Sequence, residues 1–308
     1  MIENPMDVLN NFPIRKNKKQ KQAFRDAVQS YLHSLGYESN VEKVGSANNV
    51  VVGDPEQAKI LITAHYDTPA GMIIPNLITP CSFWPFMGYQ LVITALMLGI
   101  SLIPGLILTA FGMPSEFASR LWILTLYGIL ALMLFGPANK SNANDNTSGV
   151  VTVLETAATI PEEYRSKICF VLFDLEEAGL IGSSGYFKKH KKAAKEQLVL
   201  NCDCVGDGNE LMMFPSKKVK KNEELMENLR SSCITIGEKS LQIRERSFAY
   251  YPSDQKHFPY GIGIAAFNRS SWAGLYCDKI HTNKDTVLDE NNVSFLRDRL
   301  IEIVRRAV

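Results

Sequence analysis

Residues 170–179 read FVLFDLEEAG. An apolar run with strand character ends abruptly in Asp174, and two adjacent carboxylates, Glu176 and Glu177, follow. In open α/β sheets the carboxyl ends of strands face the ligand crevice, where a buried charge persists only if it is paired or bound to a metal. Adjacent side chains on non-helical backbone point in different directions, so one glutamate can hold a metal while its neighbour reaches a water molecule on that metal. The alternative is a pair of surface glutamates that open a helix and are favoured by its dipole.

The composition bounds the class of protein. A chain of 308 residues is long enough for one large α/β domain or two small ones. The net charge of +1 gives no reason to expect a nucleic-acid partner. The amino terminus lacks the apolar core of a secretory signal, so we expect no cleaved signal peptide and a cytoplasmic catalytic part. Six cysteines without a spaced framework are interpreted as free thiols in a reducing compartment: Cys81, Cys169, Cys202, Cys204, Cys233 and Cys277.

Hydrophobic periodicity predicts an α/β chain. Helices are expected at residues 18–35, 150–159, 221–236 and 290–306, and another follows the glycines of 179–185 and extends to about Lys192. The expected strands are 41–44, 49–52, 59–64, 167–175, 196–202, 211–214, 241–244 and 263–267. The strand at 59–64 is almost entirely apolar, which is typical of the centre of a sheet.

Histidines and carboxylates recur at the ends of these strands or just before helices. His65 and Asp67 follow a central strand and share a face in extended backbone, so Asp67 can fix the tautomer of the histidine. Asp145 is the sole carboxylate among the small residues of the loop 136–149, so it can enter a tight site and bridge two cations. His281 lies in a loop before the last helix. Taken singly, each of these residues also has a purely structural explanation.

Asp203 lies between two cysteines, and either the thiols or the carboxylate can face a metal. Strand alternation places Asp203 on the face opposite Cys202 and Cys204. The surrounding carboxylates favour Asp203, with the thiols as small core residues. Two histidines and three carboxylates then form a nitrogen and oxygen ligand set that suits zinc, and they suffice for two ions if one carboxylate bridges.

Two long segments, residues 91–112 and 121–136, contain no charged side chain and are separated by a short polar stretch. At about 1.5 Å per residue the first can cross a hydrocarbon core of about 30 Å, whereas the second is short unless Phe117 and Ala118 extend it. The pattern predicts a helical hairpin, inserted in or lying on a membrane, with both ends on the side of the catalytic domain. Arg120, near the tip, would have to reach the far interface in a spanning hairpin. The alternative is an apolar lid or dimer contact.

The motifs resemble the co-catalytic zinc aminopeptidases of metallopeptidase family twenty-eight, relatives of bacterial leucyl aminopeptidases, glutamate carboxypeptidase and glutaminyl cyclase. His65-Tyr66-Asp67 resembles the His-x-Asp motif of that family, and Asn144-Asp145-Asn146-Thr147-Ser148-Gly149 resembles its Asn-Asp-Asn-x-Ser-Gly motif. Residues 176–183, EEAGLIGS, are similar to Glu-Glu-x-Gly-Leu-x-Gly-Ser. Asp203 and the stretch from His281 to Thr286 are similar to the remaining two elements. The resemblance covers residues 18–308 except the hairpin.

The resemblance implies a mixed, mainly parallel sheet with helices on both faces and a site for two zinc ions. It implies Glu176 as the general base and Asp67 as the orienting carboxylate. One tyrosine among Tyr250, Tyr251 and Tyr276 is expected to stabilise the oxyanion. The implied zinc ligands, with Asp145 bridging, are His65, Asp145, Glu177, Asp203 and His281.

The expected domains are a zinc peptidase domain, 1–78 and 137–308, and an inserted hairpin, 79–136. The expected activity is removal of amino-terminal residues from peptides, including apolar ones, at the cytoplasmic membrane, with residues 91–136 contacting the membrane and the catalytic domain facing the cytoplasm. Glutaminyl cyclisation, which would need one zinc, and an inactive membrane-tethered interaction domain are the alternatives. The chain departs from the family in two places. Ser253-Asp254 is followed by Gln255 where the family often has histidine, and the connection from Asp67 to Asp145 is much longer.

Overall fold

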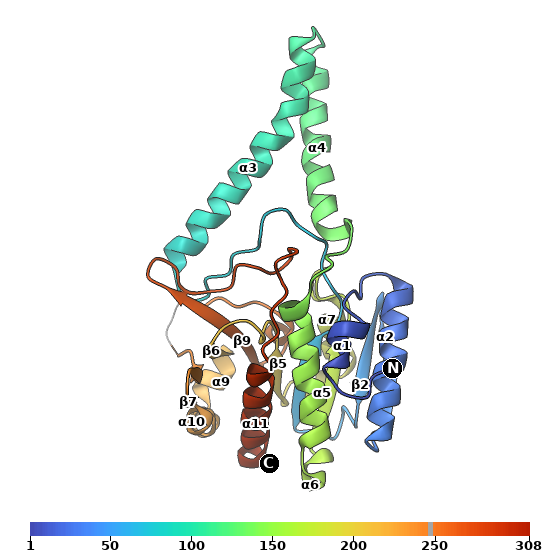
Figure 1. Ribbon diagram of the computed structural model, residues 1–308, viewed down its shortest axis with the longest axis vertical. Helices are drawn as coiled ribbons and strands as arrows, with labels where there is room; N and C mark the ends of the chain where they lie inside the picture. Colours follow the sequence, from blue (N-terminus) through green and yellow to red (C-terminus); the bar gives the residue numbers. More distant parts are fainter. Residues whose placement is uncertain (246–248) are drawn as a thin grey trace.

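The computed structural model describes residues 1–245 and 249–308, which contain a ten-stranded sheet (Figure 1). The strand order is β1-β2-β4-β3-β5-β9-β6-β8-β7, and β10 pairs with β9. The strands are β1 (Ser39–Val44), β2 (Ala47–Val52), β3 (Ile60–His65), β4 (Ile168–Phe173), β5 (Leu198–Cys202), β6 (Glu210–Pro215), β7 (Ile234–Ile236), β8 (Lys239–Ile243), β9 (Tyr260–Ser270) and β10 (Gly274–Tyr276).

The centre of the sheet is parallel. Strand β3 pairs in parallel with both β4 and β5, and β5 pairs in parallel with β9. Antiparallel pairings attach β2 to β4 on one side and β6 to β9 on the other. Strands β3, β4 and β5 are buried along their whole length, as expected for apolar strands covered on both faces. The expected mixed sheet is confirmed, and its parallel pairings are those of this central group and that of β6 with β8.

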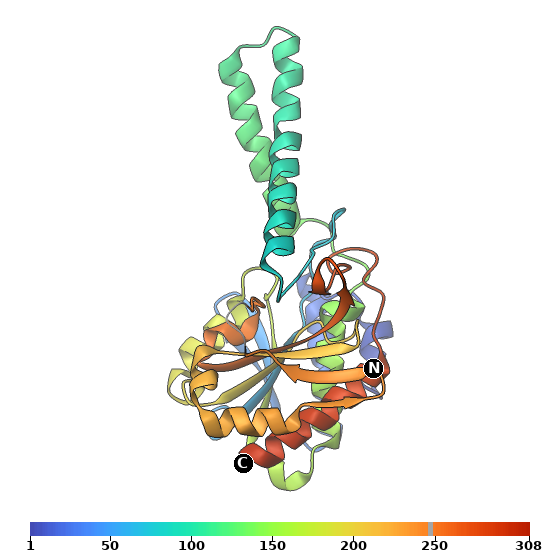
Figure 2. The ribbon, with the colours of Figure 1, turned by 90° about the vertical axis from the view of Figure 1, so that its left-hand side faces the viewer.

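Helices cover both faces of the sheet (Figures 1 and 2). Alternate residues of one strand enter different cores, because successive side chains of a strand point to opposite faces. Ile60 and Ile62 pack with residues of α2, α5 and α11, whereas Leu61 packs with Tyr186 of α7. The helices are α1 (Asp7–Asn11), α2 (Lys18–Ser34), α3 (Phe83–Ala110), α4 (Ser115–Phe135), α5 (Gly149–Thr159), α6 (Glu162–Arg165), α7 (Ile181–Lys189), α8 (Lys191–Ala194), α9 (Lys217–Lys221), α10 (Glu223–Ser232) and α11 (Glu290–Ala307).

One expected helix, over residues 221–236, is wrong in extent. The chain forms α9, then α10, then the strand β7. Asn222 interrupts the helix because its side chain accepts a hydrogen bond from Leu225 N at 3.0 Å and caps α10. The β-branched residues Ile234-Thr235-Ile236 pair with β8 instead of continuing the helix, and Gly237, with a φ of 59°, makes the turn between the two strands.

Helices α3 and α4 form the expected hairpin and project away from the rest of the molecule (Figures 1 and 2). They contain 28 and 21 residues, which correspond to about 42 Å and about 31 Å of helix. Helix α4 begins at Ser115, so Phe117 and Ala118 do extend it to membrane-spanning length. Both helices are apolar and long enough to cross a bilayer, and only Ser101 and Gly105 of the hairpin are buried within them. Length, composition and exposure suggest membrane association.

Candidate metal centre

Asp145 lies between the two predicted histidine ligands. Its Oδ1 is 3.3 Å from Nε2 of His65, and its Oδ2 is 3.1 Å from Nε2 of His281. Asp203 approaches the first histidine, with Oδ1 3.6 Å from its Nε2, and Glu177 approaches the second, with Oε2 3.5 Å from its Nε2. All five predicted ligands therefore meet in one place, in two groups that share Asp145.

The two groups each have the dimensions of a metal site. The ligand atoms of His65, Asp145 and Asp203 lie within 4.8 Å of one another, and so do those of Asp145, Glu177 and His281. Three of these residues come from the carboxyl ends of the central strands: His65 ends β3, Glu177 follows β4, and Asp203 follows β5. Because these strands are parallel, their carboxyl ends lie side by side at the same end of the sheet, which is where α/β folds bind ligands.

Asp67 holds the glutamate pair in position. Its Oδ1 accepts a hydrogen bond from Glu176 N at 3.0 Å, and its Oδ2 is 3.3 Å from Glu177 N. The Nδ1 of His65 lies 3.2 Å from the backbone oxygen of Asp67 and 3.6 Å from its Oδ1. Asp67 therefore contacts the histidine as expected, and it also fixes the backbone of both glutamates, which the sequence analysis did not foresee.

The loop that carries Asp145 is buried rather than solvated. All residues of the kinked segment η1 (Ala143–Ser148) are buried. The carboxylate of Asp285 accepts hydrogen bonds from Asn144 N at 2.7 Å and Asp145 N at 3.0 Å. A Cβ on Gly149 would lie 2.3 Å from Cys202 O, so only glycine fits where the loop meets β5. The small and amide residues of this motif therefore serve close packing and backbone hydrogen bonds.

The two cysteines beside Asp203 belong to the hydrophobic core. Cys202 packs against the α5 side of the sheet, and Cys204 packs with aromatic residues of β6 and β9. Burial raises the pKa of both thiols, and it is Oδ1 of Asp203 that lies 3.6 Å from Nε2 of His65. Of the two possibilities left open by the sequence, the carboxylate is therefore the group that faces the histidines.

Burial and neighbouring charges shift the pKa values of the site residues. Burial raises the pKa of Glu176 and of Glu177, and the negative charge of neighbouring carboxylates raises them further. Burial would also raise the pKa of Asp145, but hydrogen bonds from His281 and His65 outweigh it and lower that pKa. Burial disfavours protonation of His65, yet Glu176 and the bonds to Asp145 and Asp203 raise its pKa. The site concentrates negative charge that a divalent cation would neutralise.

The donor set fits zinc. Imidazole nitrogens and carboxylate oxygens are ordinary zinc ligands, and each group supplies three protein residues. Within the described residues, Oε1 of Glu177 is buried without a hydrogen-bond partner. A buried carboxylate oxygen without a partner is costly unless a cation fills the place beside it.

A cavity of about 240 Å³ opens over the carboxylates and histidines. Tyr250 and Tyr251 line it, whereas Tyr276 is not among its lining residues in the described part of the chain. Tyr251 is buried and its hydroxyl donates to Asp203 O at 3.0 Å, so that hydroxyl is already engaged. Tyr250 is half exposed, and its ring lies 5.7 Å from that of Phe86, a residue of the first turns of α3 that also lines the cavity.

Two buried charged residues near the site were missed by the sequence analysis. Arg15 is fully buried, and its guanidinium donates to Phe12 O at 2.6 Å and to Thr147 Oγ1 at 3.1 Å, beside the loop of Asp145. Burial lowers its pKa to about 10, and Asp67 and Asp145 oppose that shift. Asp254 is fully buried near Glu176, and burial raises its pKa to about 7. The Ser253-Asp254 motif could have pointed to Asp254 as a site residue, whereas no sequence pattern marks Arg15.

Gln255 stands where the family often has histidine, and its amide is used inside the fold. Its Oε1 accepts from Asn201 Nδ2 at 3.0 Å, and its Nε2 donates to Tyr251 O at 2.7 Å. A Cβ on Gly263 would lie 2.6 Å from Gln255 Nε2, so the side chain packs tightly against β9. This departure therefore supports the loop that carries Tyr250 and Tyr251.

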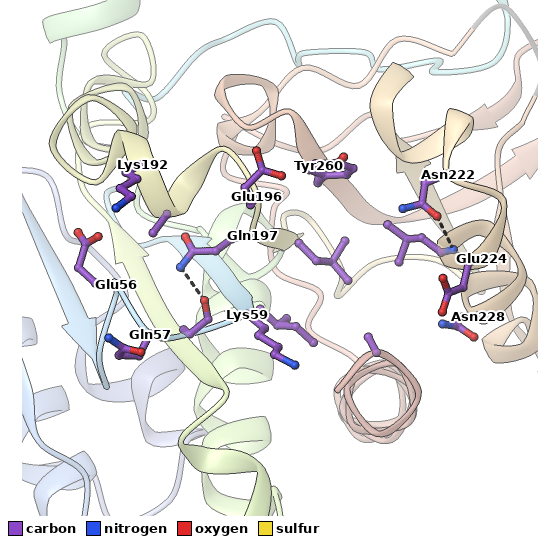
Figure 3. A pocket seen from close by; sticks show the side chains of 16 residues that line it. Glu56, Gln57, Lys59, Lys192, Glu196, Gln197, Asn222, Glu224, Asn228 and Tyr260 are labelled. Atoms are coloured by element: carbon purple, nitrogen blue, oxygen red, sulfur yellow. Dashed lines mark hydrogen bonds between the residues drawn. The ribbon is translucent and has the colours of Figure 1, made fainter.

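A second hollow, of about 710 Å³, lies at the other end of the central strands, where β3, β5 and β9 begin (Figure 3). Its lining mixes lysines, glutamates and amides, including Lys59, Glu196 and Gln197. Gln197 donates to the backbone at Ala58 O, 2.8 Å away, and so serves the fold. Among the described residues, none of the metal-binding groups includes a residue of this hollow.

Because several buried acids are grouped together, the metal-free protein is predicted to lose stability as pH rises. Burial and Asp145 raise the pKa of Asp285 to about 7, and the pKa of Asp254 is also about 7. Between about pH 4 and pH 7 the folded state then binds more protons than the unfolded chain, so the free energy of unfolding falls as pH increases. Thermal unfolding with a chelator should give a lower Tm at about pH 8 than at about pH 5.5, and added zinc should raise the Tm most at the higher pH. A metal-free protein that is more stable at the higher pH would contradict this reading of the site.

Comparisons with solved structures show the fold of zinc exopeptidases. The LapA aminopeptidase of Legionella pneumophila superposes with a TM-score of 0.59 at 14% identity, over 99% of this chain and 71% of that one. The glutaminyl cyclase of Porphyromonas gingivalis gives 0.58 at 16% identity, over 97% and 94% of the two chains. A Zn-dependent exopeptidase from Parabacteroides distasonis gives 0.57 at 16% identity, over 97% and 96%.

A search of curated proteins gives no match. The sequence profile of the family described as Peptidase family M28 matches residues 131–299, which is more than half of the 308 residues. The matched range includes the loop of Asp145, the glutamate pair, Asp203 and His281. The chain therefore belongs to peptidase family M28, as its motifs led us to expect.

Proposed function

We propose that this protein is a zinc-dependent aminopeptidase that uses two metal ions. The observation that carries the proposal is the position of Asp145, whose two carboxylate oxygens face different histidines, 3.3 Å and 3.1 Å away. His65 and Asp203 would hold one ion, and His281 and Glu177 the other, with Asp145 shared. When bound, the ions would lower the pKa of a water molecule and polarise the substrate carbonyl.

Glu176 is the residue proposed as general base. Its backbone is fixed by Asp67, and its side chain belongs to a compact group with His65 and Glu177. A raised pKa brings a glutamate closer to neutral pH, where it can both accept and return a proton. Glu176 would take the proton of the attacking water and deliver it to the amine that leaves. The peptide C–N bond breaks, and the products are a free amino acid and a shortened peptide.

The size of the cavity supports action at a chain end. A volume of about 240 Å³ is small, and the segment 76–78, Phe86 and Tyr250 partly cover it. The carboxylates would bind a substrate amino group, and the apolar residues Leu77, Ile78 and Ile280 would contact its first side chain. Tyr250 is the remaining candidate to stabilise the oxyanion, since the hydroxyl of Tyr251 is engaged by Asp203 O.

The hairpin is proposed to hold the catalytic domain at a membrane. We assign residues 79–136 to this insertion and residues 1–78 and 137–308 to the catalytic domain, with the domain in the cytoplasm. Supporting this, both helices have the length and composition of membrane spans and expose their apolar side chains. Lys16 and Lys140 lie beside the end of α4, and basic residues near a span favour the cytoplasmic side.

Glutaminyl cyclisation is the competing reaction on this scaffold. In it the amino-terminal nitrogen of a glutaminyl peptide attacks its own side-chain amide, and ammonia leaves. Two groups of ligands that share Asp145 favour hydrolysis with two ions over cyclisation with one. A protein that releases ammonia from glutaminyl peptides and leaves aminoacyl anilides intact would replace the proposal by cyclisation.

Replacing Glu176 with glutamine is predicted to reduce turnover of aminoacyl anilides by about 10²–10⁴-fold without loss of zinc, because the proton acceptor is removed while the ligands remain. Replacing Glu177 with glutamine should instead lower the zinc content, since this residue is a proposed ligand. Glu196→Gln, at an exposed position in the other hollow, is the surface control. Turnover is measured by anilide release and zinc by elemental analysis. Normal cleavage by the Glu176→Gln protein would show that another group is the base.

The intact protein is predicted to stay with membranes after washes at high salt and high pH, because the exposed apolar surface of α3 and α4 needs a lipid or detergent environment. Detergent should release it. The distribution is followed by immunoblotting of fractionated cells. Recovery of intact protein in the soluble fraction without detergent would contradict membrane attachment and favour an apolar lid.

A further inference from the structure

The side of the catalytic domain beneath the hairpin carries exposed apolar residues of its own. Trp272 lies at the turn between β9 and β10 and is 66% exposed, although it is remote in sequence from the hairpin. This turn lies at the foot of α3, because a Cβ on Gly274 would be 2.8 Å from Oγ of Ser82, the residue before the helix. Trp84, in the first turn of α3, is 80% exposed. Two tryptophans are therefore presented to solvent near one foot of the hairpin.

A third exposed residue lies between the two feet. The segment 72–79 crosses from one foot to the other (Figure 1). Its start is fixed beside the end of α4, where Gly71 N donates to Pro137 O at 2.9 Å, and its end lies beside β10, where Ile78 bridges to Cys277. Ile73 in this segment is 100% exposed. Because its side chain is fully exposed, Ile73 takes no part in the packing of the domain.

Basic side chains gather at the other foot. Lys16 Nζ donates to Leu134 O, in the last turn of α4, at 3.2 Å, so the start of α2 lies beside this helix. Lys18 and Lys19, at that start, are exposed, and so is Lys140, a few residues beyond α4. Ile73, Trp84, Trp272, Lys18, Lys19 and Lys140 together define the hairpin-side face. It combines indole rings, an apolar tip and lysines, the composition of surfaces that rest in lipid headgroups.

We propose that the hairpin-side face itself docks on the headgroup layer of an anionic bilayer. Its occupant is the lipid surface, because the face is continuous with two membrane-length helices and its lysines complement anionic lipid. The catalytic cavity lies beside this face, because its lining includes Asn76, from the segment that carries Ile73, and Phe86, two residues beyond Trp84 in α3. The cavity therefore opens at the lipid surface, and its substrates are peptides whose amino termini lie in the headgroup region. This inference rests on the proposed membrane attachment of the hairpin, and it adds a second contact made by the catalytic domain.

The three tryptophans provide the test, because the chain has Trp84 at the foot, Trp122 in α4 and Trp272 in the domain. Full-length proteins that keep one tryptophan, with phenylalanine at the other two positions, are reconstituted into vesicles of phosphatidylcholine and phosphatidylglycerol. Part of the phosphatidylcholine is brominated near the headgroup, which quenches indole fluorescence at that depth. The matched control has no native tryptophan and carries Ile236→Trp, on β7, the exposed edge strand of the sheet, which lies away from the hairpin (Figure 1).

The proposal predicts loss of Trp272 fluorescence comparable to that of Trp84, with emission shifted to shorter wavelength, and little loss for the Ile236→Trp control. Replacing Lys18, Lys19 and Lys140 with glutamine should reduce quenching of Trp272 and leave that of Trp122 unchanged. If lipid brominated deeper in the bilayer quenches Trp122 while Trp272 behaves like the control, the hairpin is inserted but the domain is not docked. If no tryptophan is quenched, membrane attachment itself fails. Hydrolysis of a soluble aminoacyl anilide, measured separately, reports on the proposed peptidase activity in either case.

Discussion

The structure depends on one constraint, which is that several negative charges must be buried close together at the carboxyl ends of β3, β4 and β5. Asp145 is the centre of this arrangement, since each of its oxygens faces a different histidine. Other carboxylates fix the backbone that carries these acids. Asp67 accepts hydrogen bonds from the backbone N–H groups of the glutamate pair, and Asp285 accepts hydrogen bonds from those of the Asp145 loop. Arg15 adds a buried positive charge beside that loop. Compensating cations would stabilise such an arrangement, which is why the geometry and the family both point to a metal centre.

The hairpin and the catalytic site are connected through the short segment that joins them. Residues 70–72 run beside the end of α4 and the loop of His281, and residues 76–78 line the cavity before α3 begins. Phe86 then brings the first turns of α3 to the cavity, against Tyr250. Under the proposed membrane attachment, an insertion that places a membrane-length helix within a few residues of the substrate cavity would determine where the enzyme finds its substrates. A long connection at this position would then change the setting of the reaction without altering its chemistry.

Much of this could be predicted from the sequence because the signals are local. The apolar strands ending in His65, Glu176 and Asp203 predict both the parallel centre of the sheet and the grouping of their carboxyl ends, and the uncharged stretches predict the hairpin. The five proposed ligands were named from these positions and from motif resemblance. Other features depend on contacts between distant segments, which leave no pattern in the sequence. One example is Arg15, which is buried against Thr147 although the two residues are far apart in the sequence. Another is the β strand at 234–236, whose conformation depends on pairing with β8.

The central claim is that Asp145 is shared by two zinc ions, and anomalous diffraction at the zinc absorption edge tests it most directly. Crystals of the zinc-loaded protein should show two anomalous peaks on either side of this carboxylate. One should lie among His65, Asp145 and Asp203, and the other among Asp145, Glu177 and His281. A single peak, or peaks remote from Asp145, would contradict the account.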